Sequence, residues 1–108
     1  MSLDADMIYE KIMEAAREWV SADEESRKLK ELKPIILSEI ANQQDQSLSL
    51  AARTSLALAS PEYRLHCVKM VEAKTKSNMT QARYKAAQNL AELRRSQESS
   101  RRAEMGMK

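Results

Sequence analysis

The sequence has very little glycine, proline, cysteine or aromatic side chain. It contains one Gly, two Pro and no Phe among its 108 residues. Asn-Gly and similar turn pairs are absent, which excludes tight β-hairpins and with them ordinary sheet architectures. The residues that dominate instead are Ala, Glu, Lys, Leu, Arg, Gln and Met, the strongest helix formers by intrinsic propensity. The composition therefore predicts an all-α protein.

Cysteine and histidine are too scarce for a disulfide scaffold or a structural zinc site. Cys67 is the only cysteine and His66 the only histidine, whereas a zinc site of that kind needs four such ligands. Neighbouring residues on a helix point about 100° apart, so His66 and Cys67 do not converge as a nucleophile and its base. We therefore expect both side chains to have structural roles.

Other catalytic equipment is also lacking. Phosphate-binding loops need several glycines, and the single glycine is Gly106, close to the C-terminus. Glu10, Glu14 and Glu18 are spaced at four-residue intervals, but Lys11 interleaves with them as on an ordinary solvated helix face. We expect no catalytic residue, no metal, no cofactor and no small-molecule substrate, and hence no enzyme.

Long apolar runs are absent as well. No stretch approaches the ~18 apolar residues that cross a bilayer, and Asp4 and Asp6 stand where a signal peptide carries basic residues. A single cysteine suits a reducing compartment. The sequence predicts a cytoplasmic protein that is neither exported nor inserted in a membrane.

Charge is distributed unevenly along the chain. Residues 1–60 hold 7 Lys and Arg against 11 Asp and Glu, whereas residues 61–108 hold 11 against 5. An acidic half is therefore joined to a basic half. The two halves can attract each other, within one chain or between chains, or the basic half can bind an acidic partner.

Apolar residues recur every three or four positions in the first half, which predicts acidic amphipathic helices within residues 1–46. The apolar positions are Ile8, Ile12, Ala15, Ala16, Trp19, Leu29, Leu32, Ile36 and Ile40. Ser21 and Glu24 have the spacing of a capping box, so we expect a bend near residues 21–23. Pro34 costs about 3 kcal/mol inside a helix and predicts a kink or a restart.

Two signals place the later helices. Residues 42–47 are polar, and Ser47 is a candidate N-cap for a short helix over residues 47–59. Ser60 followed by Pro61 is typical of a helix start, because serine caps and proline suits the first helical position. We expect one long basic helix over residues 60–103, on the order of 60 Å, and a frayed tail over residues 104–108.

The long helix carries an apolar stripe that resembles a coiled-coil seam. Its members are Leu65, Val68, Val71, Met79, Ala82, Ala86, Leu90 and Leu93. The stripe weakens at residues 75–78, which indicates a bend, a polar layer or a change of partner. A helix longer than its own domain needs cover for such a stripe, so we expect a homo-oligomer, with a dimer as the first choice.

Basic residues along the same helix are candidate contacts for nucleic acid. They are Lys74, Lys76, Arg83, Lys85, Arg94, Arg95, Arg101 and Arg102. Lys and Arg that neutralise phosphates would give binding with steep salt dependence. The alternative is that these charges solvate the helix and pair with the acidic half, since only Tyr63 and Tyr84 are available to stack on bases.

The C-terminal half resembles a class of small helical proteins encoded by bacteriophages and prophages, mostly of unknown function. The resemblance lies in residues 57–63, the Ala- and Arg-rich helix after them, and residues 93–105. It implies a phage origin, the cytoplasm of a bacterial host, and a place among genes of phage DNA replication or recombination. It implies no catalytic residues, and residues 1–46 resemble no family.

Together these features predict one structural domain, an elongated helical hairpin or small bundle with one long C-terminal helix and coiled-coil-like packing. The predicted function is that of a non-enzymatic interaction or assembly protein, an accessory of phage DNA metabolism. The alternative is a direct nucleic-acid binder that uses the basic helix and its arginine tail.

Overall fold

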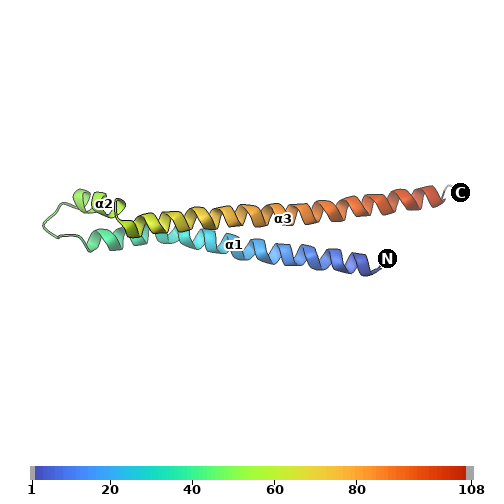
Figure 1. Ribbon diagram of the computed structural model, residues 1–108, viewed down its shortest axis with the longest axis horizontal. Coiled ribbons are helices and arrows are strands. Elements are labelled where there is room, and N and C mark those ends of the chain that lie inside the picture. The colour runs from blue at the N-terminus through green and yellow to red at the C-terminus, as the bar shows by residue number, and fades with distance from the viewer. Residues whose placement is uncertain (1, 107–108) are drawn as a thin grey trace. The chain divides into compact units, whose positions relative to one another are not determined.

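The protein is built from three helices. The computed structural model describes the backbone of residues 2–106 and the side chains of residues 5–106. Along the chain, α1 spans Ser2–Asn42, α2 spans Leu50–Leu58 and α3 spans Pro61–Gly106 (Figure 1). No strand occurs within residues 2–106. The prediction of an all-α fold with one long C-terminal helix is confirmed.

Helix α1 is longer than its local signals suggest. It continues through residues 21–23 and contains Pro34, so the helix is not interrupted at the capping-box residues and does not restart at the proline. Burial explains the difference, because Ala22 and Ile40 are each only 5% exposed. Ending the helix at either signal would withdraw one of them from its packing. The exposed Pro34 therefore loses a backbone hydrogen bond without ending the helix.

Helix α2 begins two residues later than predicted. Ser49, not Ser47, is its N-cap, and the Ser49 Oγ accepts the Ala52 N–H at 3.1 Å. Ser47 instead donates its backbone N–H to the Asp45 Oδ1 at 2.9 Å, which closes a turn of the kind that aspartate forms with the residue two positions on. This bond also lowers the pKa of Asp45, because it favours the ionised carboxylate.

Helix α3 begins where the sequence predicts. The Ser60 Oγ accepts the Tyr63 N–H at 3.2 Å and donates to the Ala57 carbonyl oxygen at 2.7 Å, so one hydroxyl joins the end of α2 to the start of α3. At the other end, α3 includes Glu104–Gly106, since no glycine or proline stands between Pro61 and Gly106. The rest of the predicted tail, residues 107 and 108, lies outside the described residues.

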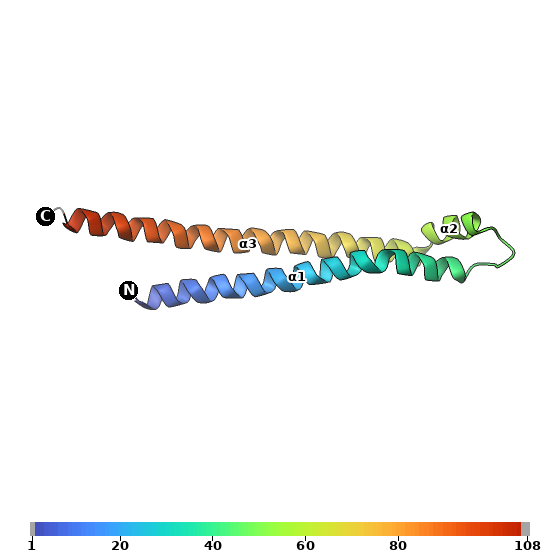
Figure 2. The same cartoon turned by 180° about the vertical axis from the view of Figure 1, so that it is seen from behind.

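The chain divides into two compact units, each formed by segments from more than one helix. The terminal unit comprises Met1–Val20 and Asn78–Lys108, and the central unit comprises Ser21–Ser77. In each unit a segment of α1 lies antiparallel to a segment of α3, and in the central unit α2 lies beside the end of α1 (Figure 1, Figure 2). Each helix segment therefore has one side turned toward a neighbour.

The central unit has a small apolar core where its three helices meet. The buried residues are Ile40, Ala41, Ala57 and Tyr63, with Ile36, Leu37 and Cys67 packed against them. Ala57 is fully buried. The placement of Cys67 beside this core agrees with a structural role for its thiol.

Two buried polar contacts join α1 to α3 in the central unit. The His66 Nε2 lies 2.8 Å from the Leu29 carbonyl oxygen, and because a carbonyl only accepts, Nε2 carries the proton. The Ser77 Oγ donates to the Asp23 Oδ1 at 3.3 Å. Ser77 is 3% exposed and falls in the weak stretch of the apolar stripe. Ser77 therefore adds a polar contact on the side of α3 that faces α1, while Thr75, Lys76 and Asn78 are exposed.

The Ser60 cap gives a first test of this fold. Replacing Ser60 with Ala removes the acceptor for the Tyr63 N–H, so the free energy of unfolding should fall by about 1 kcal/mol. Urea denaturation followed by circular dichroism, at one protein concentration, measures the change. The control is Ser55→Ala, an exposed position inside α2, for which the change should stay within about 0.5 kcal/mol. Equal losses in the two variants would contradict the capping role.

Candidate interaction surfaces

The inner face of the terminal unit is narrow. From α1 it receives the half-buried Ile8, Ile12, Ala15, Ala16 and Trp19, all members of the predicted amphipathic stripe. From α3 it receives the buried Thr80 and the half-buried Tyr84, Ala87 and Ala91. The rings of Trp19 and Tyr84 stack with their centroids 5.5 Å apart and their planes 28° apart. This stacked pair joins α1 to α3 in the terminal unit.

The side of α3 that faces α1 follows a seven-residue repeat. Tyr63, Met70 and Ser77 mark it in the central unit, and Tyr84 and Ala91 mark it in the terminal unit; all five are buried or half-buried. A repeat of seven keeps one side of a helix against its neighbour, as in coiled coils. Many of the side chains on this face are small or polar. The face was missed in the sequence because its signal is regular spacing and not aliphatic character.

The predicted seam lies on the other side of α3. Leu65, Val68 and Val71 in the central unit are 51–67% exposed, and Met79, Leu90 and Leu93 in the terminal unit are 52–55% exposed. Ala82 and Ala86 are exposed too. At about 100° per residue, Ala86 and Leu93 stand roughly opposite Tyr84 and Ala91 around the helix axis. The described chain uses one side of α3 for itself and leaves the aliphatic side open.

We refer to the terminal-unit part of this open side as the outer stripe. Its residues are Met79, Ala82, Ala86, Leu90 and Leu93. Contiguous exposed apolar residues of this kind are typical of a protein–protein contact, whereas scattered single ones are not. The alanines lower the helix surface between the larger side chains, so a second backbone can approach closely.

The predicted nucleic-acid contacts are all exposed, but they do not share one side of α3. Lys74 and Lys76 belong to the central unit, where Lys74 lines a polar hollow of about 490 Å³ with Asp23, Arg27 and Met70 among its walls. Arg83 and Lys85 belong to the terminal unit and point in nearly opposite directions, two residues apart. The structure therefore does not bring the eight residues into a single basic face.

The four arginines at the end of α3 are better organised. Arg94 and Arg101 form one row and Arg95 and Arg102 a second, because residues seven apart lie on the same side of a helix. The rows are about 100° apart. Arg95 contacts Glu92 at 3.8 Å, and both side chains are largely exposed, so this pair contributes little to stability. Figure 1 shows α3 continuing past the first described turn of α1, which leaves room around the end of both rows.

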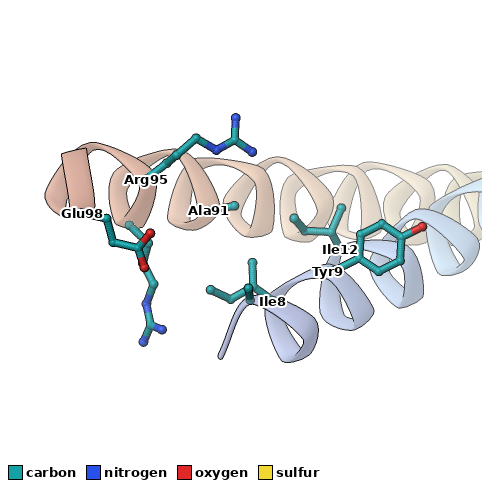
Figure 3. A pocket seen from close by; sticks show the side chains of 8 residues that line it. Ile8, Tyr9, Ile12, Ala91, Arg95 and Glu98 are labelled. Carbon is teal, nitrogen blue, oxygen red and sulfur yellow. The ribbon is translucent and has the colours of Figure 1, made fainter. Parts of the chain in front are cut away.

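A shallow pocket lies between α1 and α3 in the terminal unit. It has a volume of about 300 Å³ and is lined by Ala5, Ile8, Tyr9, Ile12, Ala91, Arg94, Arg95 and Glu98. Figure 3 shows Ile8 and Ile12 on the side of α1 turned toward α3, while the guanidinium of Arg95 points away from α1. The floor is apolar and the charged groups stand at the rim. No buried charged side chain converges on this space among its lining residues, so it lacks the features of an enclosed substrate site.

The described residues offer no candidate metal site. Among them, no group of three or more His, Cys, Asp or Glu side chains is arranged to hold a metal ion. His66 is buried and bonded to the Leu29 carbonyl, which agrees with its predicted structural role. Within the part of the chain that the structure describes, none of the helices has the length and apolar character needed to cross a bilayer.

Comparisons with known proteins add no relative. No protein-family model, no curated protein and no solved structure matches the sequence. The resemblance of the C-terminal half to small phage proteins therefore stays a prediction.

The aromatic pair of the terminal unit gives a second test. Tyr84→Leu keeps an apolar side chain but removes the stack on Trp19, so the free energy of unfolding should fall by about 0.5–1.5 kcal/mol. Trp19 is the only tryptophan, and its fluorescence during urea denaturation follows this unit directly. The control is Tyr9→Leu, where the ring is 62% exposed. A larger loss at Tyr9 than at Tyr84 would contradict the packing described.

Proposed function

We propose that the protein acts by helix–helix association, as a non-enzymatic interaction or assembly protein whose binding surface is the outer stripe of α3. The observation that carries this proposal is the position of the stripe. Met79, Leu90 and Leu93 are each more than half exposed, on the side of α3 away from the face that packs against α1. The chain supplies no cover for them among its described residues.

The energy available from covering the stripe is substantial. Burying a Leu or Met side chain fully stabilises a complex by roughly 1.5–3 kcal/mol relative to leaving it in water. Three such side chains, with Ala82 and Ala86 between them, offer a helix partner apolar contact along about four turns of α3. A small, monomeric, all-helical protein has no evident use for such a surface. Self-association is the simplest form of cover, because symmetric dimers are the commonest oligomers.

A catalytic role has no support in the geometry. The pocket of the terminal unit has an apolar floor, with Arg94, Arg95 and Glu98 at its rim. His66 and Cys67 lie in or beside the core of the central unit. We propose no enzyme activity and no cofactor for this protein.

Charge on the stripe tests the proposal. Leu90→Glu together with Leu93→Glu places two carboxylates on the outer stripe, where an apolar contact would have to desolvate them. We expect the wild-type protein to show a dimer mass by light scattering at micromolar concentration and the double variant to show a monomer mass. Circular dichroism should remain helical in both, since neither side chain packs within the chain.

The matched control adds the same charge away from the stripe. Gln88→Glu together with Ser21→Glu adds two carboxylates at exposed, polar positions, one roughly opposite Ala86 around the axis of α3 and the other on α1. This control should keep the wild-type mass. A monomeric wild-type protein at high micromolar concentration, or a dimer that survives in the double variant, would overturn self-association through this surface.

Direct binding of nucleic acid is the second candidate function. The observation that favours it is the pair of arginine rows at the end of α3, where Arg94, Arg95, Arg101 and Arg102 are all exposed within about three turns. Arginine forks bind phosphate oxygens bidentately, and two rows about 100° apart can contact the two sides of a groove. The bases would be read weakly, because Tyr84 is stacked on Trp19.

A titration with DNA tests this candidate. If the arginine rows bind phosphates, affinity should fall by about 10²-fold between 50 and 200 mM salt, with a slope close to the number of arginines in contact. Replacing all four arginines with Ala should abolish binding. Lys74→Ala together with Lys76→Ala is the control, since these residues lie in the other unit. Absence of binding at low salt removes the candidate.

The biological setting follows only from the phage resemblance of the C-terminal half. Under that resemblance, an assembly protein of this kind would be an accessory of phage DNA metabolism in the cytoplasm of a bacterial host. Both candidate functions fit such a setting.

A further inference from the structure

We infer that the outer stripe is covered by a second copy of this chain running antiparallel, with Ala86 of one copy opposite Asn89 of the other. The inference rests on the proposed function, because it specifies what binds the stripe and in which orientation. Three kinds of observation support it, namely the spacing of residues on α3, their sizes, and the charges that flank them.

The spacing assigns the positions of the contact. The side of α3 that faces α1 repeats every seven residues through Tyr84 and Ala91. Under the same repeat, the opposite side is built from two alternating sets of exposed residues, Met79, Ala86 and Leu93 in one and Ala82, Asn89 and Ser96 in the other. In a pair of coiled helices these two sets form the layers of the contact. Leu90 stands beside the layers on one flank.

Side-chain size favours the antiparallel arrangement. With residue 86 opposite residue 89, Leu93 of one copy meets Ala82 of the other, and Met79 meets Ser96. Each layer then combines a larger side chain with a smaller one, so the two backbones can keep an even separation. In a parallel pair, each residue would face the same residue of the other copy. Leu93 would pack against Leu93, Ala86 against Ala86 and Ala82 against Ala82. Those layers would differ in thickness and leave gaps, which well-packed contacts avoid.

Charge on the flank supports the same orientation. Lys85 and Glu92 are exposed and seven residues apart, so they stand on one flank of the stripe. In the antiparallel pair, Lys85 of each copy lies beside Glu92 of the other, and the two-fold axis makes this contact twice. In a parallel pair Lys85 would lie beside Leu90 instead. This flank is therefore complementary to itself only when one helix is reversed.

The contacts of Arg83 and the positions of the terminal arginines also favour the antiparallel orientation. On the opposite flank, Arg83 of one copy reaches Leu90 of the other, and the aliphatic stem of an arginine can cover a leucine while its guanidinium stays in water. A parallel pair would also place Arg94, Arg95, Arg101 and Arg102 of the two copies side by side, and like charges repel. In the antiparallel pair, the arginine clusters of the two copies lie at opposite ends of the contact.

Disulfide cross-linking tests the orientation. In full-length protein carrying Cys67→Ala, two single-cysteine variants are made, Ala82→Cys and Leu93→Cys, and one of them bears a tag that changes its mass. The antiparallel pair brings position 82 of one copy next to position 93 of the other, whereas two cysteines at position 82 are offset by about 16 Å along the axis. After mixing, subunit exchange and mild oxidation, we expect the mixed cross-link and neither self-cross-link.

The cross-linking pattern and the mass in solution separate the inferred orientation from self-association itself. Self-cross-links of Ala82→Cys would establish a parallel pair and overturn the inference while leaving self-association intact. A dimer mass with no cross-link of either kind would mean another register or another surface, which also overturns it. A monomer mass for the wild-type protein would instead defeat the proposed function itself, so the two failures are distinguishable.

A charge exchange gives an independent check. Lys85→Glu and Glu92→Lys should each raise the dimer dissociation constant by about threefold to tenfold, because each places like charges together twice. The double exchange restores opposite charges in the antiparallel pair only, so its dissociation constant should return to within about twofold of wild type. Arg83→Glu with Glu92→Lys, in which the exchanged positions lie on different flanks, is the control and should not be restored. Additive losses in the Lys85–Glu92 double variant would contradict the inferred register.

Discussion

The constraint on which the structure depends is that α3 packs against α1 through one narrow side in each unit. That side repeats every seven residues and consists largely of small or polar groups, with Tyr63 and Tyr84 as its largest members. Few large apolar side chains of α3 are therefore buried between α3 and α1. The leucines, valines and Met79 that would form a core in a bulkier protein stay on the opposite side. The proposed function follows from this arrangement, in which one side of α3 packs against α1 and the opposite, aliphatic side is exposed.

Polar contacts add specificity where the apolar core is thin. In the central unit His66 bonds to the Leu29 carbonyl and Ser77 to Asp23. His66 and Ser77 are costly to bury without a partner, since an unpaired buried donor or acceptor loses its hydrogen bonds to water. The contacts therefore stabilise this unit mainly by penalising arrangements in which the partners are separated. The Trp19–Tyr84 stack has a comparable role in the terminal unit.

Much of the fold could be predicted from the sequence, and the errors share one physical origin. Ser60 and Pro61 located the start of α3, because capping is a local interaction between neighbours in the chain. Ser21 and Pro34 carry local signals for the end of a helix, yet α1 runs through both without interruption, because burial of Ala22 and Ile40 outweighs local preference. The inner face of α3 was missed because Ser77 and Thr80 do not look like core residues. The aliphatic stripe was found, and its exposure could be learned only from the three-dimensional arrangement.

The hydrogen bond between Ser77 and Asp23 has a consequence for how the helices stay in register. A seven-residue repeat built from alanines and similar small groups would let α3 slide along α1 by one full repeat at little cost. A slide that brings Met70 opposite Asp23 would lose this hydrogen bond, because a thioether has no proton to donate to a carboxylate. Asp23 would keep its ion pair with Arg27 at 2.9 Å within α1, but Ser77 would leave its acceptor. One serine therefore favours the observed register of the two helices over this shifted one.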